Sequence, residues 1–174
     1  MTDGRIVVTG MGAVTPIGIG VSSYWGNLCA GVNGISSIER FDPSGLPVKV
    51  AGEIKDFNAS DFLPKKEART MDLFMQYAFA AAEEALEGAQ LKRKAVPERI
   101  SIVLGTALGG ITTAAQTQER ITKRDSYRVS PHTVPKILGN IAAAQIAIHH
   151  DIKGPSLTVN TACSSGADVI GMAQ

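Results

Sequence analysis

Cysteine and histidine are scarce in this sequence, with 2 and 3 copies in 174 residues. Two cysteines, Cys29 and Cys163, are too few for the framework of a disulfide-rich protein. The histidines (His132, His149 and His150) have no cysteine or glutamate at the spacing of a metal site. We therefore expect neither a metal nor another bound cofactor.

An excess of charge and a long apolar run are also missing. Lys and Arg total 17 and Asp and Glu total 16, which argues against a strongly basic nucleic-acid-binding protein. No run approaches the roughly 18 apolar residues of a membrane helix. The first residues include Asp3 and lack the basic and apolar regions of a signal peptide. We expect a soluble cytoplasmic protein that binds neither nucleic acid nor membrane.

Aromatic residues make up only 5% of the chain, whereas glycine occurs 18 times. Small side chains allow the close packing of layered α/β proteins. Apolar runs typical of strands occupy residues 5–10, 48–51, 100–105 and 156–161. Helical patterns occupy about residues 22–30, 71–91, 109–123 and 135–148, and another begins at Ser164. Because strands alternate with helices, the sequence predicts one α/β domain over residues 1–174.

The strongest signal for chemistry is the segment 160–166 (NTACSSG), in which Cys163 lies between a predicted strand and a predicted helix. A strand–turn–helix arrangement projects a side chain from the edge of a sheet. The N-terminus of a helix favours a thiolate, and its N–H groups stabilise the oxyanion of an acyl intermediate. The residues alone leave two alternatives open for Cys163, a nucleophile or a buried structural cysteine. We expect Cys29 to be a small apolar residue within a helix.

Two glycine-rich segments do not match nucleotide-binding motifs. In residues 10–18 (GMGAVTPIG), Thr15 stands where a dinucleotide-binding fingerprint has its third glycine, and no acidic residue follows at the required distance. Residues 105–110 (GTALGG) lack the Lys and Ser or Thr of a P-loop. We expect the glycines of residues 105–110 to let the end of a strand pack closely on a pocket.

Two groups of charged residues have ordinary interpretations. His149 and His150 are neighbours, and we expect them at an exposed helix end. Lys65, Lys66 and Arg69 form a small basic cluster at the start of a helical pattern. Such a cluster is either a solvated helix face or a surface for an acidic partner.

Several motifs together resemble the β-ketoacyl-acyl-carrier-protein synthases, the elongating condensing enzymes. The matching segments are residues 7–18 (VVTGMGAVTPIG), 69–77 (RTMDLFMQY), 105–110, 130–131 (SP), and 154–166 with its GPS and TACSSG. Their order and spacing are most similar to the type II branch. The resemblance extends from about Arg5 to Gln174.

The resemblance implies a thiolase-like fold with two similar halves in an αβαβα arrangement, working as a homodimer. This chain would be the N-terminal half. It implies that Cys163 accepts an acyl chain from acyl carrier protein and that its backbone N–H is one oxyanion donor. Malonyl-acyl carrier protein would then lose CO₂, and the resulting carbanion would attack the acyl-enzyme to give a longer β-ketoacyl chain.

The resemblance also assigns residues to the acyl pocket. Leu108 matches the position at the pocket floor, where a bulky residue limits chain length. His132 and Thr133 match a gate segment in which type II relatives usually carry two aromatic residues. This departure leaves the preferred chain length open.

Partner surfaces follow from the same resemblance. Lys65, Lys66 and Arg69 match the region that receives the acidic carrier protein, and residues 156–160 match the strand that pairs across the dimer. The two catalytic histidines, the lysine and the second oxyanion donor of the family come from the C-terminal half. We therefore expect this chain to need a complementing half for condensation.

Two alternatives are a non-catalytic scaffold similar to a chain-length-factor subunit and a fragment of a polyketide ketosynthase. Cys163 argues against the scaffold, because such subunits usually replace the nucleophile. The Ser164-Ser165-Gly166 continuation favours fatty-acid synthesis over the Ser-Ser-Ser that is frequent in polyketide enzymes.

Overall fold

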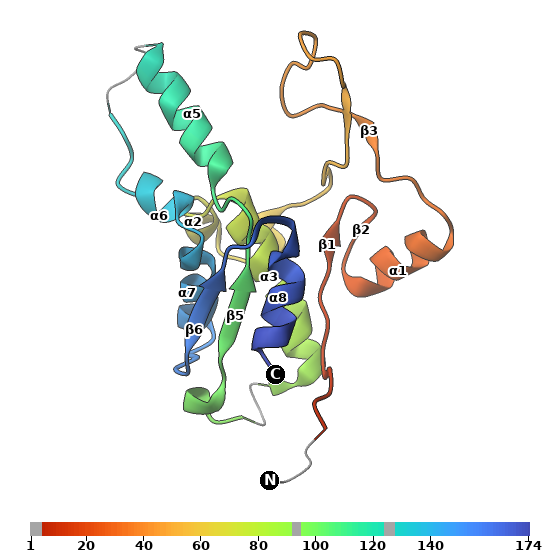
Figure 1. Cartoon of the computed structure of the whole chain (residues 1–174), viewed down its shortest axis with the longest axis vertical. Coiled ribbons are helices and arrows are strands. Elements are labelled where there is room, and N and C mark those ends of the chain that lie inside the picture. The colour runs from red at the N-terminus through yellow and green to blue at the C-terminus, as the bar shows by residue number, and fades with distance from the viewer. Residues whose placement is uncertain (1–4, 92–94, 124–127) are drawn as a thin grey trace.

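The computed structural model describes residues 5–91, 95–123 and 128–174 and contains an α/β body and a smaller N-terminal lobe (Figure 1). The lobe comprises β1 (Val14–Thr15), β2 (Gly18–Ile19), α1 (Val21–Cys29), β3 (Ser36–Ser37) and β4 (Val50–Ala51). The body begins with the short 3₁₀ helix η1 (Ala59–Asp61), α2 (Lys65–Ala68), α3 (Leu73–Ala89), η2 (Pro97–Arg99) and β5 (Ile102–Gly105). It continues with α5 (Ile111–Thr122), α6 (Thr133–Ile137), α7 (Asn140–His149), β6 (Ser156–Val159), η3 (Ala162–Ser164) and α8 (Ser165–Met172). The predicted α/β class is confirmed.

The two longest strands, β5 and β6, form a parallel pair in which Ile102 lies opposite Ser156 and Gly105 opposite Val159. A parallel pair needs a crossover connection, which α5, α6 and α7 supply. Helix α7 contacts both strands and α3, whereas α8 contacts mainly β5. Because both strands run in the same direction, the segments that follow them start at one edge of the sheet. We call it the carboxyl edge.

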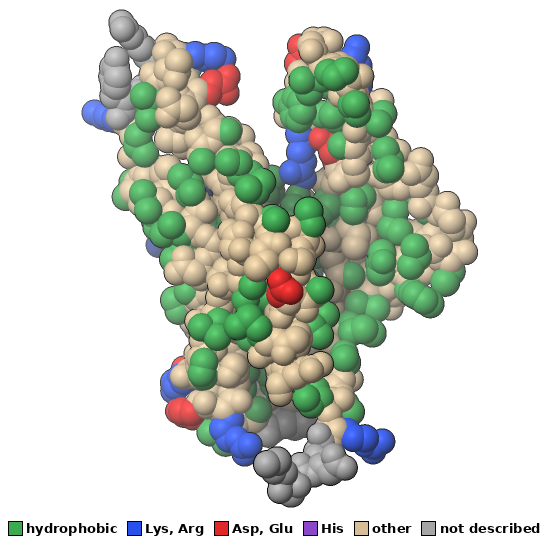
Figure 2. Space-filling model, in the orientation of Figure 1, with side chains coloured by type: hydrophobic (Ala, Val, Ile, Leu, Met, Phe, Trp, Pro, Cys, Tyr) green, Lys and Arg blue, Asp and Glu red, His purple; other side chains and the backbone are tan. Residues whose placement is uncertain are grey.

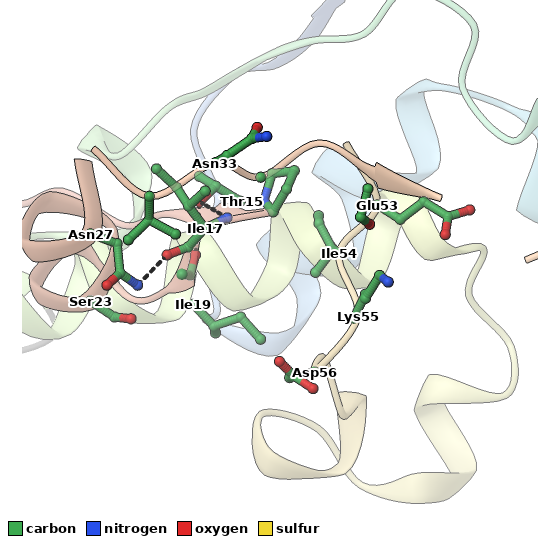
Figure 3. A pocket seen from close by; sticks show the side chains of 15 residues that line it. Thr15, Ile17, Ile19, Ser23, Asn27, Asn33, Glu53, Ile54, Lys55 and Asp56 are labelled. Atoms are coloured by element: carbon green, nitrogen blue, oxygen red, sulfur yellow. Dashed lines mark hydrogen bonds between the residues drawn. The ribbon is translucent and has the colours of Figure 1, made fainter. Parts of the chain in front are cut away.

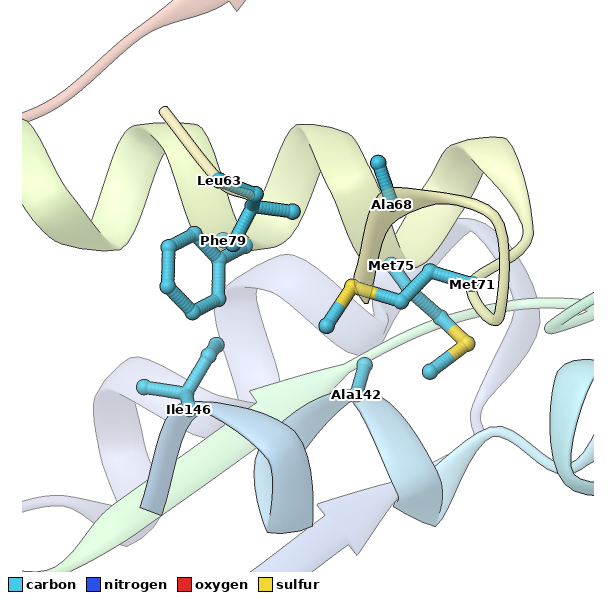
Figure 4. Packing of buried hydrophobic residues seen from close by; sticks show 7 residues of the cluster. All are labelled: Leu63, Ala68, Met71, Met75, Phe79, Ala142 and Ile146. Carbon is cyan, nitrogen blue, oxygen red and sulfur yellow. The ribbon is translucent and has the colours of Figure 1, made fainter. Parts of the chain in front are cut away.

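The core lies between α2, α3 and α7 (Figure 4). Met75 and Phe79 recur at helical spacing on α3, and Ala142 and Ile146 do so on α7. The buried cluster consists of Leu63, Ala68, Met71, Met75, Phe79, Ala142 and Ile146. The predicted helix over residues 71–91 is confirmed, and Asp72 caps its N-terminus by accepting the Phe74 N–H.

The lobe is fastened to the body through Glu84 of α3. Its carboxylate accepts the Ala13 N–H at 3.0 Å and the Val21 N–H at 2.7 Å. The two acceptor oxygens hold the segments on either side of the β1–β2 hairpin. This contact sets where α1 begins.

Residues 5–10, predicted as a buried strand, do not form one, so this prediction was wrong. The side chains of residues 6–8 are 67–79% exposed, and no strand of the described chain pairs with them. An apolar run becomes a strand only where a neighbouring backbone supplies hydrogen-bond partners. The glycines that follow serve a packing role, since a Cβ at Gly12 would lie 1.9 Å from the carbonyl oxygen of Ala81 on α3.

The single helix predicted over residues 135–148 is two helices. Helix α6 begins earlier, at Thr133, and the chain is extended at Leu138 before α7 starts at Asn140. Gly139 sits at this break, where a Cβ would lie 2.9 Å from Cγ2 of Thr106. The close approach of the segment after β5 explains why the helical pattern is interrupted here.

The prediction of an exposed histidine pair is wrong for His150. Its side chain is only 2% exposed, its ring stacks on Phe79, and its Nε2 lies 2.8 Å from Oε1 of Glu83. The side chain of His149 is 35% exposed. The packing of α7 on α3 buries His150, and a sequence pattern alone does not show such a contact.

The surface is rich in apolar side chains, which Figure 2 shows over both the lobe and the body. Trp25 on α1 is 61% exposed and Leu157 on β6 is 50% exposed. None of the helices in the described ranges is sufficiently long and apolar to cross a membrane.

Candidate functional site

Cys163 lies at the carboxyl edge, in the 3₁₀ turn η3 that joins β6 to α8. Cys163 is exposed, whereas the alternative of a purely structural cysteine requires a buried one. The preceding residue, Ala162, has a φ of 52°, which is uncommon for a residue with a side chain. The predicted strand–turn–helix arrangement around Cys163 is therefore present, with a strained turn at its centre. Cys29 is also exposed, at the end of α1 in the lobe.

Polar side chains of residues 160–165, which we call the Cys163 turn, bond to one another and to α8. The hydroxyl group of Ser164 donates to the carbonyl oxygen of Thr161 at 2.8 Å and lies 3.1 Å from Oδ2 of Asp168. The hydroxyl group of Thr161 donates to the same carboxylate oxygen. Asp168 thus links the end of β6 to the first turn of α8.

Ser165 is the buried polar residue of this turn, with 4% of the residue exposed. Its hydroxyl oxygen accepts the Thr161 N–H at 3.0 Å and lies 2.8 Å from the carbonyl oxygen of Ala162. In the sequence, Ser165 stands out only as part of the segment 160–166. Burial of a serine at the start of an amphipathic helix gives no distinct sequence signal.

The glycine-rich segment 105–110 follows β5 and lies beside the Cys163 turn. The Thr106 N–H donates to the carbonyl oxygen of Val159 at 3.1 Å, and the Gly109 N–H donates to the Thr106 hydroxyl group at 3.1 Å. The Gly110 N–H donates to the carbonyl oxygen of Ile137, which brings this segment to α6. Leu108, the predicted pocket residue, projects from the segment and is 69% exposed.

The two predicted gate residues differ in environment. His132 is exposed and precedes α6, whereas Thr133 is 9% exposed and its N–H donates to the carbonyl oxygen of Ser130. The Gly110–Ile137 contact places their helix next to the loop that carries Leu108. The structure thus brings the three predicted pocket residues to neighbouring segments.

The basic residues Lys65, Lys66 and Arg69 are all exposed on or next to α2. Leu63 and Ala68 anchor this short helix in the core. The cluster is therefore a surface feature on a fixed element. Within the described ranges, no group of His, Cys, Asp and Glu has the geometry of a metal site.

Two carboxyl groups with shifted pKa values lie outside this region. A hydrogen bond from Lys123 and the charge of that ammonium group lower the pKa of Glu119 on α5. Hydrogen bonds from the backbone and hydroxyl group of Ser44 lower the pKa of Asp42 in the lobe. Neither group is part of the Cys163 turn.

A separate groove with a mixed polar and apolar lining lies in the lobe (Figure 3). Its lining includes Thr15, Asn27 and Lys55, and the Asn27 side chain donates to the carbonyl oxygen of Ile17 at 2.6 Å. The hydrogen bonds drawn there join lobe residues to one another. The groove does not include Cys163 and is not part of the candidate site.

An apolar cavity runs along β5 on the body. Side chains of α3, including Ala78 and Ala82, line it together with Val103 of β5 and Met172 of α8. Within the described residues, β5 pairs with β6 along one edge and with no strand along the other.

Comparisons with known proteins agree on one family. Residues 3–174 match the sequence model of the beta-ketoacyl synthase, N-terminal domain. The 3-oxoacyl-[acyl-carrier-protein] synthase 2 of Staphylococcus aureus (strain COL) is 42% identical over 170 residues, which cover 97% of this chain and 41% of that protein. The protein with the same description from a Synechocystis species is 39% identical over 168 residues, or 96% of this chain and 40% of that protein.

Solved structures show the same fold. The ishigamide ketosynthase/chain length factor aligns with a TM-score of 0.80 and 29% identity over 96% of this chain and 44% of that chain. A beta-ketoacyl synthase from Burkholderia phymatum aligns with a TM-score of 0.76 and 24% identity over 97% of this chain and 42% of that chain. The chain thus spans about two-fifths of the length of the relatives that it matches.

Proposed function

Because the chain belongs to the family of β-ketoacyl synthase N-terminal domains, we propose that Cys163 is the acyl-accepting nucleophile of a fatty-acid condensing enzyme. The observation that carries the proposal is the exposed thiol in a turn between a parallel strand and a helix, at the carboxyl edge. The family match and the position of the thiol support it independently.

In the proposed first step, the Cys163 thiolate attacks the carbonyl carbon of an acyl thioester. A carbon–sulfur bond forms and the carbonyl electrons move to oxygen, giving a tetrahedral oxyanion. The Cys163 backbone N–H stabilises this oxyanion. The oxyanion then collapses, the thiolate of acyl carrier protein leaves with the electron pair of its bond, and it takes up a proton from solvent.

In the proposed second step, malonyl-acyl carrier protein loses CO₂, and the resulting carbanion attacks the carbonyl carbon of the acyl-Cys163 thioester. The Cys163 thiolate leaves, and a β-ketoacyl chain remains on the carrier protein. His149 and His150 do not serve this step, because they lie at the end of the sheet opposite Cys163. His150 lines a cavity there together with Pro97 and Ile100, which precede β5. We propose that a complementing half supplies the missing groups.

The proposed substrate is a fatty acyl chain rather than a polyketide. Two relatives with the 3-oxoacyl-[acyl-carrier-protein] synthase 2 description share 39–42% of residues with this chain, against 29% for the ishigamide ketosynthase/chain length factor. Because scaffold subunits usually replace the nucleophile, the presence of Cys163 favours an acyl-accepting subunit. We place the reaction in the cytoplasm, where thiols persist in reduced form.

We further propose two partners. An acidic acyl carrier protein docks on the exposed charges of Lys65, Lys66 and Arg69, which face solvent from a fixed helix. A second copy of the chain pairs with residues 156–160, since β6 bonds to β5 along only one of its edges within the described chain. The exposed side chain of Leu157 would be covered there.

The first step is tested by the mass of the intact chain before and after incubation with an octanoyl-acyl carrier protein. We expect a gain of one octanoyl group that persists in Cys29→Ala and disappears in Cys163→Ala. Cys29 is a matched control because both thiols are exposed. Labelling that persists in Cys163→Ala would contradict the proposed nucleophile.

The second step is tested by adding malonyl-acyl carrier protein to the acylated chain, with and without a separately expressed C-terminal half of a relative. We expect the β-ketoacyl product only when that half is present. Condensation by this chain alone would contradict the need for a complementing half.

A further inference from the structure

Ser165 connects three segments that meet at the carboxyl edge. Its buried hydroxyl oxygen accepts the N–H of Thr161, at the end of β6, and its hydroxyl group donates to the carbonyl oxygen of Ala162 in η3. The carbonyl oxygen of Thr106, after β5, lies 3.4 Å away. With 4% of the residue exposed, this hydroxyl group has little access to water.

The backbone around Ser165 is also fixed against β5. A Cβ on Gly105 would lie 2.6 Å from the Ser165 carbonyl oxygen and 3.2 Å from the Ser165 Cβ. Glycine at position 105 therefore permits the start of α8 to rest directly on the last residue of β5. Ser165 is therefore in close contact with the sheet at this position.

The bond between Ser165 and Ala162 has a consequence for Cys163. The carbonyl group of Ala162 and the N–H of Cys163 belong to one planar trans peptide unit, in which the C=O and N–H point in opposite directions. Ala162 has a positive φ, so this peptide is held in an orientation that the chain rarely adopts unaided. Both the N–H and the hydroxyl group of Ser165 bond to the Ala162 oxygen. The same bonds therefore direct the Cys163 N–H away from Ser165.

We propose that Ser165 is a positioning residue, whose buried hydroxyl group orients the Ala162–Cys163 peptide so that its N–H meets the oxyanion of acyl transfer. This proposal rests on the proposed function of Cys163. Ser165 acts through the peptide and does not touch the substrate.

The test compares two reactions of the same thiol in a Cys29→Ala background. Acylation by octanoyl-N-acetylcysteamine, a small thioester, passes through an oxyanion, whereas alkylation by iodoacetamide displaces iodide and forms none. In Ser165→Ala, we expect the acylation rate constant to fall roughly 10- to 100-fold. We expect the alkylation rate constant to change by less than about threefold. A merely structural role would lower both reactions alike.

Ser164→Ala is the matched control, because it removes an exposed hydroxyl group of the same turn that bonds to Thr161 instead of Ala162. We expect the ratio of its two rate constants to equal that of the parent. If Ser165→Ala does not show a cooperative thermal transition, the comparison is made in an Ala162→Gly background, where glycine accommodates the positive φ.

The outcomes separate the two proposals. A parent chain that is alkylated but never acylated at Cys163 overturns the proposed function and Ser165 with it. If the parent is acylated but Ser165→Ala leaves the ratio of the acylation to the alkylation rate constant unchanged, only the role of Ser165 is overturned. A ratio that falls equally in Ser164→Ala also overturns it.

Discussion

Asp72, which caps α3, accepts hydrogen bonds from both the backbone N–H and the hydroxyl group of Thr113 in the first turn of α5. Asp72 is 7% exposed, so its carboxylate depends on these donors and on the Phe74 N–H. The contact joins the core helix to the helix that follows the glycine-rich segment. It therefore holds one side of the candidate site to the core.

Removing the Thr113 hydroxyl group will destabilise the fold. Thr113→Val keeps the shape of the side chain but takes one donor from a buried carboxylate, at a cost of about 1.5–3 kcal/mol. Thr112→Val is the control, since Thr112 is exposed in the same turn. Urea denaturation measures both, and equal midpoints would show that the bond contributes nothing.

The close contact between Gly12 and α3 predicts opposite effects of alanine at two glycines. Gly12→Ala places a Cβ against the Ala81 carbonyl group and will cost about 1–3 kcal/mol. Gly26→Ala lies in α1 with nothing near its added Cβ, and will stabilise by about 0.5–1 kcal/mol. Thermal unfolding of the two variants should move in opposite directions.

Charge reversal at the proposed docking surface will slow association with acyl carrier protein. In Lys65→Glu/Lys66→Glu, we expect the association rate constant to fall about tenfold at low salt, and the difference to shrink as salt rises. Lys49→Glu in the lobe is the control, because Lys49 is also exposed but lies on a different surface. Stopped-flow binding would refute the proposal if both variants slowed alike.

The Glu119–Lys123 pair on α5 gives a pH prediction. Lys123 lowers the pKa of the Glu119 carboxyl group in the folded chain, so the pair's contribution to stability is present above the ordinary glutamate pKa. It is lost as the pH falls through the lowered value. Lys123→Gln should raise the Glu119 pKa toward its ordinary value, as followed by NMR of the side-chain carboxyl carbon. An unchanged titration would show that Lys123 is not the cause.

Prediction from the sequence succeeds for elements whose apolar residues pack against another element within the described residues. Met75 and Phe79 define α3 by their spacing, and Ile146 on α7 completes the same cluster. Residues 5–10 also have an apolar pattern, but no strand among the described residues pairs with them, so the same reasoning fails. The break at Gly139 arises from contact with Thr106, which is distant in sequence.

Around the candidate site, local features were predicted and tertiary ones were not. The turn that carries Cys163 follows from a strand followed by small residues and a helix. The buried hydroxyl group of Ser165 depends on Gly105, and the burial of His150 depends on Phe79 and Glu83. The roles of Leu108, His132 and Thr133 in an acyl pocket stay predictions, although their segments are neighbours.

Because β5 and β6 pair in parallel, two loops that are distant in the sequence lie next to each other in space. Gly105 lies opposite Val159, so the segment with Leu108 and the segment with Cys163 leave the sheet side by side, yet more than fifty positions apart in the chain. Under the proposed function, substitutions in the loop with Leu108 would reshape the space around the acyl chain without altering the residues next to the Cys163 thiol. The proposed substrate preference would then be free to diversify while the residues around Cys163 stay constant.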